Sequence, residues 1–182
     1  MPPWVNLANL FTLLRLALVP FVVSDIIFGF HFRALVLFFI AAVTDVIDGA
    51  IARSSDATTQ SGAYLDPIAD KCLLSGVFFA LWAAGIVPAW YVGIVFGRDL
   101  LILAGVLAAL VLTKVRKFPP SHWGKVSTFV QIVTAISWMT QNAWPRPAFQ
   151  GIARALLWIS AAFTAASGVD YARRGIYLLR PR

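Results

Sequence analysis

The chain has 182 residues, of which 60% are hydrophobic and 13% are charged, and its mean hydropathy is +0.80. This composition excludes an ordinary soluble domain and predicts an integral membrane protein with a single domain, residues 1–182. The net charge of +7 comes from cations grouped at the ends of apolar runs, which indicates membrane topology and anionic lipid as partners and argues against nucleic acid.

Six apolar segments of roughly 20 residues are each long enough to cross a hydrocarbon core of ~30 Å. They cover residues 7–28, 32–53, 63–84, 88–113, 123–140 and 148–171. The sequence therefore predicts an all-α integral membrane protein with six transmembrane helices. Residues 1–9 are too short to add a span, and with Trp4 and two prolines they are expected to lie at the membrane interface.

Lysine and arginine are distributed unevenly between the two sets of connections. Nine lie in the connections 53–62 and 113–125 and in the C-terminal tail, whereas two, Arg33 and Arg146, lie in the opposite connections. By the positive-inside rule, both termini and the mouth of any cleft between residues 45 and 70 face the cytoplasm. A multi-pass protein of the inner or plasma membrane is expected.

Four aspartates form the main polar feature of the chain. Asp45, Asp48, Asp66 and Asp70 are half of its eight acidic residues. On a helix, residues 45, 48, 49 and 52 share one face, and residues 66 and 70 are an i,i+4 pair on the next helix. The short connection between these helices would bring the four carboxylates into one cleft, where they repel each other unless cations lie between them. Carboxylate oxygens suit Mg²⁺ or Mn²⁺.

Each of these residues also has a structural interpretation. Asp66 precedes a proline and could cap a helix, although capping does not explain Asp70 one turn later. The small residues Gly49 and Ala52 permit either close helix packing or close approach of a substrate. Arg53 is either an interfacial arginine whose head reaches water or a fork of donors for a pyrophosphate.

The spacing D-x2-D-G-x2-A-R-x8-G-x3-D-x3-D resembles the signature of the CDP-alcohol phosphotransferase family. Every fixed position of that signature is matched without a gap, by Asp45, Asp48, Gly49, Ala52, Arg53, Gly62, Asp66 and Asp70. The signature covers 26 residues, and the apolar layout around it extends the resemblance to the whole chain.

The resemblance implies a metal-dependent site. Asp45, Asp48 and Asp66 are expected to ligate one Mg²⁺ or Mn²⁺ ion, with Asp70 joining at a second ion and accepting the proton of the attacking hydroxyl. The residues expected to bind the CDP moiety are Asn9, Gly49, Ala52, Arg53, Thr59 and Gly62. A homodimer is also implied by the resemblance.

The first apolar segment carries an unusual polar pattern. N9-L-F-T12-L-L-R15, followed by Pro20, is similar to the opening of phosphatidylglycerophosphate and cardiolipin synthases within this family. The hydroxyl of Thr12 could instead bond its own helix. Arg15 lies near the middle of a span, where a charged group needs a partner.

Cations in the second half of the chain are candidates for binding the acceptor. Arg98 is followed by Asp99, and because neighbouring helix positions point about 100° apart, each is expected to find a partner elsewhere. Arg98 is either an anion ligand or part of a structural salt bridge. G124-K125-V-S-T-x2-Q131 resembles a segment of phosphatidylglycerophosphate synthases. The expected ligands of an acceptor phosphate are Arg98, Arg116, Lys117 and Lys125.

These observations favour transfer of a phosphatidyl group from CDP-diacylglycerol to glycerol-3-phosphate, with release of CMP. The alternative acceptor is phosphatidylglycerol, as in CMP-forming cardiolipin synthases, because the uncharged run after Asp99 departs from the pattern of the glycerol-3-phosphate enzymes. A hypothesis of another class is a cation-coupled transporter, although the aspartates cluster near one membrane face. A catalytically inactive lipid-binding relative is disfavoured because every signature residue is present.

Overall fold

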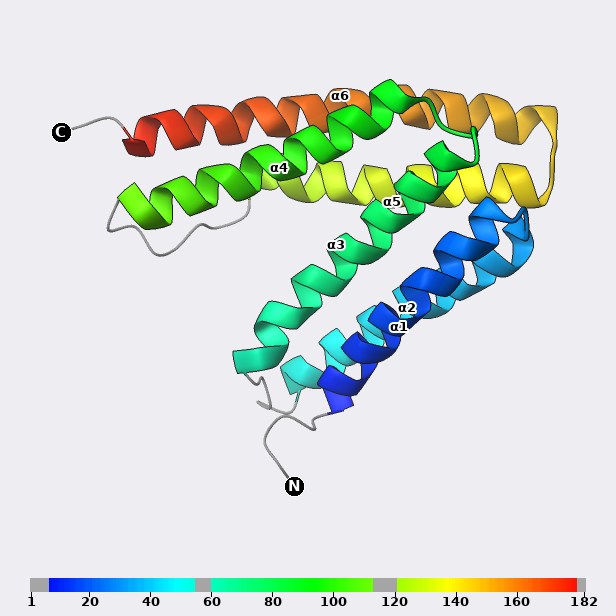
Figure 1. The fold of residues 1–182 in the computed structure, drawn as a ribbon, viewed down its shortest axis with the longest axis horizontal. Helices are drawn as coiled ribbons and strands as arrows, with labels where there is room; N and C mark the ends of the chain where they lie inside the picture. The colour runs from blue at the N-terminus through cyan, green and yellow to red at the C-terminus, as the bar shows by residue number, and fades with distance from the viewer. Residues whose placement is uncertain (1–6, 55–59, 113–120, 180–182) are drawn as a thin grey trace. The chain divides into compact units, whose positions relative to one another are not determined.

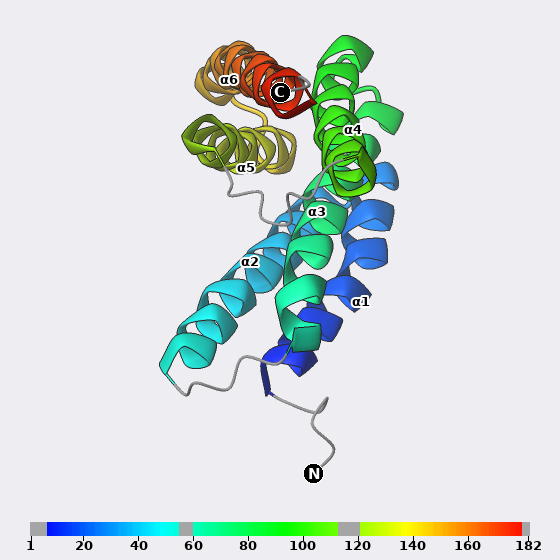
Figure 2. The ribbon, with the colours of Figure 1, turned by 90° about the vertical axis from the view of Figure 1, so that its left-hand side faces the viewer.

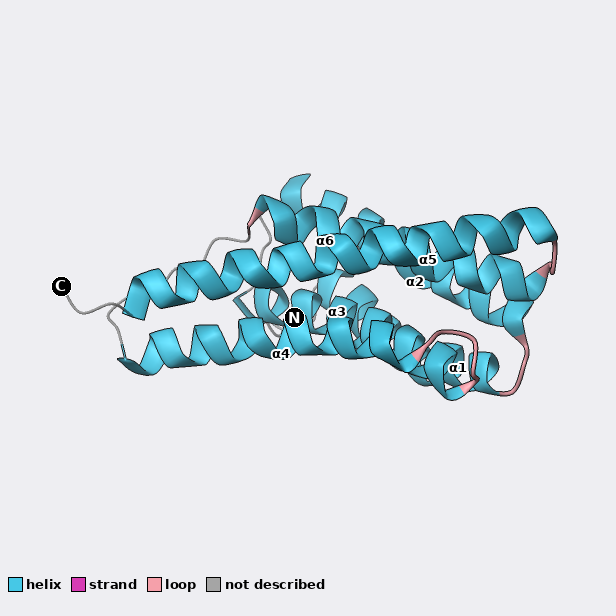
Figure 3. Cartoon of the chain, turned by 90° about the horizontal axis from the view of Figure 1, so that it is seen from above, coloured by secondary structure: helices cyan, strands magenta, loops and turns pink. Residues whose placement is uncertain are grey.

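The computed structural model describes the backbone of residues 7–54, 60–112 and 121–179, and the side chains of residues 12–44, 69–108 and 121–175. Within these ranges the chain is entirely α-helical, without a strand (Figures 1 and 3). The helices are α1 (Leu7–Ile27), α2 (His31–Ser54), α3 (Gln60–Ala83), α4 (Ala89–Leu112), α5 (His122–Ala143) and α6 (Pro147–Leu179). The predicted all-α class is confirmed.

The helix boundaries agree closely with the predicted spans. Each predicted end lies within three residues of a helix end, except that α6 continues to Leu179, eight residues past the predicted end at 171. Its 33 residues correspond to a length of about 50 Å, which exceeds the thickness of a hydrocarbon core. The apolar pattern therefore predicts where the helices begin better than where α6 ends.

The helices fall into two compact units. The first comprises Met1–Val87 with Met139–Pro145, and thus contains α1, α2, α3 and the end of α5. In it, α1 packs against both α2 and α3 (Figure 2). The second comprises Pro88–Trp138 with Arg146–Arg182, and in it α4 and most of α5 pack with α6.

Two helices end at a glycine with the same left-handed backbone conformation. Gly29 after α1 and Gly85 after α3 have φ angles of 83° and 71°, in the left-handed region that favours glycine. The amide of Phe30 donates to the carbonyl of Asp25 and that of Ile86 to the carbonyl of Leu81, each at 2.8 Å. This hydrogen-bond pattern satisfies the last carbonyls of a helix and turns the chain away from it.

The hairpin of α1 and α2 is closed by an ion pair. The buried carboxylate of Asp25 in the last turn of α1 accepts a hydrogen bond of 2.6 Å from Nε of Arg33, and a second from Nη2 of the same guanidinium. The guanidinium also lies over the ring of Phe30, 4.6 Å from its centroid. This bidentate contact satisfies the buried carboxylate, and its two parallel hydrogen bonds restrain the turn between the helices.

Close packing joins α1 to α3. A Cβ atom at Gly76 of α3 would lie 3.2 Å from Val23 Cγ2 and 3.3 Å from Val19 Cγ1, both on α1. At these distances a side chain would displace the two valines by a few tenths of an ångström, so the glycine permits the two helices to approach. The contact lies one and a half turns beyond Asp70 along α3.

The second unit carries its polar side chains inside. Completely buried serines, threonines and a glutamine join its helices, namely Ser127, Gln131 and Thr134 of α5 and Ser160, Thr164 and Ser167 of α6. Ser127 and Gln131 bond Thr164 between α5 and α6, whereas Ser160 and Ser167 bond side chains of α4. Large apolar side chains such as Leu100, Phe129 and Trp158 are instead exposed. Polar interiors and apolar exteriors are typical of helices surrounded by lipid, where hydrogen bonds between helices hold the bundle together.

In the part of the chain that the structure describes, two helical stretches are long and apolar enough to cross a membrane. They are Ala89–Ala108 in α4 and Pro147–Gly175 in α6. This supports membrane association, and the crossing of all six helices stays a prediction.

A valine at position 76 is expected to destabilise the protein. Gly76→Val places methyl groups against Val19 and Val23, and overpacking of this kind costs about 1–3 kcal/mol. Thermal unfolding of the purified protein in detergent measures the effect. Gly93→Val is the matched control, because nothing lies within 4 Å of a Cβ at that helical glycine. Equal unfolding midpoints for the two variants would contradict the close packing of α1 and α3.

Candidate functional site

The signature positions lie on two consecutive helices. Residues 45–53 belong to the C-terminal part of α2 and residues 62–70 to the N-terminal part of α3. The helical backbone confirms that 45, 48, 49 and 52 share a helix face and that 66 and 70 are one turn apart. The following predicted residues lie outside the described side chains: Asn9, Asp45, Asp48, Gly49, Ala52, Arg53, Thr59, Gly62 and Asp66.

The capping interpretation of Asp66 is wrong. The helix α3 begins at Gln60, six residues before Asp66, so the D66-P67 pair lies inside the helix and not at its start. Only the first turn of a helix has free amides for a carboxylate to cap. An aspartate at this position therefore needs an explanation other than capping, and its role as a ligand stays a prediction.

Asp70 is the signature aspartate whose side chain is described. Its Oδ1 accepts a hydrogen bond from Nη1 of Arg15, and the two side chains form an ion pair between α1 and α3. The side chain of Arg15 is 1% exposed, whereas that of Asp70 is 49% exposed. The partner that a mid-span Arg15 was expected to need is thus the last aspartate of the signature.

Among the described side chains, no three acidic, histidine or cysteine groups come close enough to hold a metal ion. Three of the four predicted ligands are outside that part of the chain, so the metal site stays a prediction. The donor set is made of carboxylates, and its chemistry fits Mg²⁺ or Mn²⁺.

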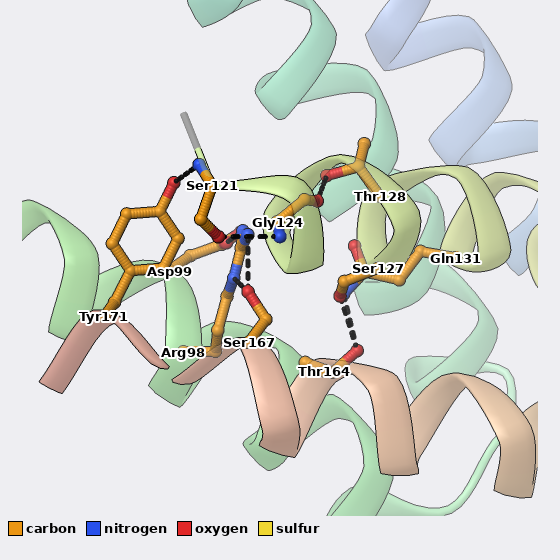
Figure 4. Close-up of polar contacts among 10 residues, drawn as sticks. All are labelled: Arg98, Asp99, Ser121, Gly124, Ser127, Thr128, Gln131, Thr164, Ser167 and Tyr171. Carbon is orange, nitrogen blue, oxygen red and sulfur yellow. Dashed lines mark hydrogen bonds and ion pairs between the residues drawn. The ribbon is translucent and has the colours of Figure 1, made fainter. Parts of the chain in front are cut away.

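Arg98 is the centre of a polar cluster in the second unit (Figure 4). Although it is 7% exposed, its guanidinium has several partners. Nε and Nη2 lie 3.2 and 3.1 Å from Oγ of Ser167, and Nη1 lies 2.7 Å from Oδ1 of Asp99. Its Cζ also lies 5.7 Å from the ring centroid of Tyr171. These contacts offset the cost of burying a cation.

The expectation that Arg98 and Asp99 cannot contact each other is wrong, because the two side chains form a direct ion pair. Their Cβ atoms do point apart on the helix, but the arginine side chain is long enough to bring its guanidinium back to the neighbouring carboxylate. Arg98 therefore carries a structural salt bridge, one of the two predicted roles, and its charge is shared with Asp99.

The start of α5 is tied to the same cluster. Oγ of Ser121 accepts a hydrogen bond of 3.0 Å from the amide of Gly124, which caps the helix, and the amide of Ser121 donates to the hydroxyl of Tyr171 at 3.1 Å. A Cβ at Gly124 would lie 3.2 Å from both Arg98 Nη2 and the Tyr171 hydroxyl. Glycine therefore lets Arg98 and Tyr171 lie close to this helix end without displacement.

The segment 124–131 divides into two faces. Ser127 and Gln131 are buried and bond Oγ1 of Thr164 at 3.1 and 2.9 Å, so they join α5 to α6. Lys125 is exposed on the opposite face, and its role as an acceptor ligand stays a prediction. Arg116 and Lys117 lie outside the described residues.

Two residues of this cluster were not predicted from the sequence. Ser167 and Tyr171 are one helical turn apart on α6, and both contact the guanidinium of Arg98. Their i,i+4 spacing within an apolar helix is the signal that could have identified them.

Comparisons with known proteins agree with the motif. A family model described as CDP-alcohol phosphatidyltransferase matches residues 5–166. A probable phosphatidylglycerophosphate synthase of Mycobacterium tuberculosis is 33% identical over 94% of this chain and 82% of its own length. The CDP-diacylglycerol–glycerol-3-phosphate 3-phosphatidyltransferase of Bacillus subtilis is 31% identical over 91% of this chain and 93% of its own length. A probable CMP-forming cardiolipin synthase of Drosophila melanogaster is 28% identical over 91% of this chain and 56% of its own length.

Removal of the Ser167 hydroxyl is expected to destabilise the second unit. Ser167→Ala takes the acceptor from two nitrogens of a buried guanidinium, and an unsatisfied buried donor costs about 1–3 kcal/mol. Chemical unfolding in detergent micelles measures the change in stability. Ser24→Ala serves as control, because the Ser24 hydroxyl bonds only the carbonyl of Phe21 in its own helix. A loss no greater than that of the control would show that Arg98 does not depend on Ser167.

Proposed function

Because the chain belongs to the CDP-alcohol phosphatidyltransferase family, we propose that it transfers the phosphatidyl group of CDP-diacylglycerol to glycerol-3-phosphate and releases CMP. The observation that carries this proposal is the complete eight-residue signature on α2 and α3. Relatives named for this reaction match at 31–33% identity over 91% of the chain, which supports glycerol-3-phosphate as the acceptor.

In the proposed reaction, the hydroxyl oxygen of the acceptor attacks the phosphorus of the phosphatidyl group and the bond to CMP breaks. Asp70 takes the proton of the attacking hydroxyl. This role is supported by the exposure of its carboxylate, which is open to solvent and substrate while Arg15 holds it from inside the helix pair.

Asp45, Asp48, Asp66 and Asp70 would hold two Mg²⁺ or Mn²⁺ ions, which supply positive charge to the pyrophosphate when bound. The family is generally dependent on divalent metals. The chain's own contribution is a set of carboxylates on two consecutive helices, which fixes the position of that charge.

The CDP moiety would lie against the ends of the same helices. Small residues at 49, 52 and 62 permit the nucleotide to approach the backbone, and Arg53 offers paired donors to the pyrophosphate. Asn9 and Thr59 complete the proposed set of contacts.

Lys125 is the acceptor ligand that the structure favours most, because its ammonium is exposed. Arg116 and Lys117 would add charge from the connection between α4 and α5. Arg98 is committed to Asp99, Ser167 and Tyr171, so we propose that it supports the start of α5, from which Lys125 projects, while it contributes to the positive field.

Phosphatidylglycerol is the second candidate acceptor, as in CMP-forming cardiolipin synthases. The pairing of Arg98 with Asp99 favours it, because a partly neutralised arginine suits a phosphodiester with one negative charge better than a phosphomonoester with two. Relatives named as CMP-forming cardiolipin synthases, at 28–29% identity, support this candidate.

The proposed setting is a single membrane domain of six crossings in the inner or plasma membrane, with both termini and the polar cleft at the cytoplasmic side, and a homodimer as the assembly. The exposed apolar side chains and the two apolar stretches in α4 and α6 support the membrane location. A cation-coupled transporter, the other hypothesis, loses its basis because the chain belongs to a transferase family.

Purified protein in detergent is expected to release CMP from CDP-diacylglycerol when Mg²⁺ and glycerol-3-phosphate are present. EDTA and Asp70→Asn should each abolish the release, because they remove the metal and the proton acceptor. Asp170→Asn, which removes a carboxylate that pairs with Arg174 on α6, is the control and should leave the rate unchanged. Release with phosphatidylglycerol alone would identify the second candidate, and no release with either acceptor would contradict the proposed function.

Lys125→Met is expected to raise the KM for glycerol-3-phosphate about 10- to 100-fold with little change in kcat. A hydrogen bond to a charged group contributes about 1.5–3 kcal/mol, and each 1.4 kcal/mol corresponds to a factor of ten. Steady-state kinetics at saturating CDP-diacylglycerol measure the effect. Arg154→Met, at another exposed cation of the second unit, should leave KM unchanged. An unaltered KM in Lys125→Met would remove this lysine from the acceptor site.

A further inference from the structure

Arg15 is the largest completely buried side chain among the described residues. It lies on α1, outside the signature, and its guanidinium is charged at all relevant pH values. Burial of such a group inside an apolar protein is expensive unless a carboxylate partners it. The contact that Arg15 makes inside the helix pair is therefore the feature to explain.

The partner of Arg15 is Asp70, and the two ends of this ion pair differ in environment. The arginine is enclosed between helices, with 1% of its side chain exposed, while 49% of the aspartate side chain is exposed. Nη1 of Arg15 donates to Oδ1 of Asp70. The contact thus runs from the interior of the helix pair to an accessible carboxylate and limits the rotation of that carboxylate.

The helices that carry this contact, α1 and α3, also pack closely against each other. Gly76 of α3 packs between Val19 and Val23 of α1, and Arg15 meets Asp70, so residues of α3 lie beside residues about 55 positions earlier on α1. The same offset at both contacts means that α1 and α3 run parallel in a constant register. Arg15 is accordingly supported by a packed helix pair and not by a loop.

We propose that Arg15 is a positioning residue that orients the carboxylate of Asp70 for its role in phosphatidyl transfer. This inference rests on the proposed function of Asp70. By holding Oδ1, Arg15 fixes the plane of the carboxylate toward the reacting hydroxyl.

A purely structural role for the same pair makes different predictions. If Arg15 only joined α1 to α3, its loss would lower stability, metal affinity and turnover together. A positioning residue gives another pattern: turnover falls, while Mn²⁺ binds more tightly, because the carboxylate is no longer shared with a neighbouring cation.

The test compares Arg15→Met and Arg15→Lys with the wild type. Three quantities are measured on purified full-length protein: kcat for CMP release, the affinity for Mn²⁺ alone by electron paramagnetic resonance, and the thermal unfolding midpoint. Arg15→Met is expected to lower kcat about 10- to 100-fold, the usual range for residues that orient a metal ligand, and to tighten Mn²⁺ binding. Arg15→Lys keeps the charge, so it should recover part of kcat with Mn²⁺ affinity near that of the wild type.

Arg33→Met is the matched control. It breaks a second arginine–aspartate ion pair among the described side chains of the first unit, with Asp25, and should lower the unfolding midpoint without changing kcat or Mn²⁺ affinity of the folded protein. If kcat of Arg15→Met equals that of the wild type, the proposal is overturned. A parallel fall of kcat, Mn²⁺ affinity and unfolding midpoint in both Arg15 variants would overturn it as well, in favour of a structural role.

The variant Asp70→Asn separates this inference from the proposed function. Arg15→Met should change Mn²⁺ affinity in the wild-type background but not when combined with Asp70→Asn, because Arg15 acts through Asp70. An equal shift in both backgrounds would contradict the coupling. If the wild type releases no CMP with any acceptor, the proposed function fails, and the comparison of Mn²⁺ affinities still decides whether Arg15 acts on Asp70. Should Arg15→Met not fold, the polar but neutral Arg15→Gln carries the same test, with the same expected fall in kcat and rise in Mn²⁺ affinity.

Discussion

The structure depends on one constraint: a charge inside an apolar protein must have a partner. Arg15 and Asp70, Arg33 and Asp25, and Arg98 and Asp99 each satisfy it by pairing. These pairs differ in position. One fastens a helix hairpin, one supports the start of α5, and one ends at an accessible carboxylate of the signature. Among these three pairs, that of Arg15 with Asp70 has the most exposed carboxylate, and this carboxylate belongs to the signature.

Different interactions hold the helices together in the two units. The first relies on close approach of helices at Gly76 and on ion pairs, whereas the second relies on buried hydroxyls and amides between α5 and α6. Hydrogen bonds of this kind stabilise helices in lipid, where apolar contacts between helices gain little over contacts with lipid. Arg98 belongs to that second arrangement, and this explains why it is enclosed while Lys125 is exposed.

Much of the fold could be predicted from the sequence, because apolar runs of membrane length have few alternatives to a helix. The helical faces at 45–52 and 66–70 followed from spacing alone, and the need of Arg15 for a partner followed from its depth. The sequence could not identify Asp70 as that partner, since the register of α1 against α3 is set by the packing of Gly76. Likewise the contact of Arg98 with Asp99 depends on a side-chain conformation that spacing does not encode, and the start of α3 at Gln60 overturned the capping role of Asp66.

We propose that the signature carboxylates on α2 and α3 hold divalent cations against a CDP-linked substrate. The most direct measurement is the anomalous difference density of Mn²⁺ in crystals grown with CDP-diacylglycerol. The account predicts peaks among Asp45, Asp48, Asp66 and Asp70, next to the pyrophosphate. A bound CDP group without Mn²⁺ density at these aspartates, or with density elsewhere, would contradict it.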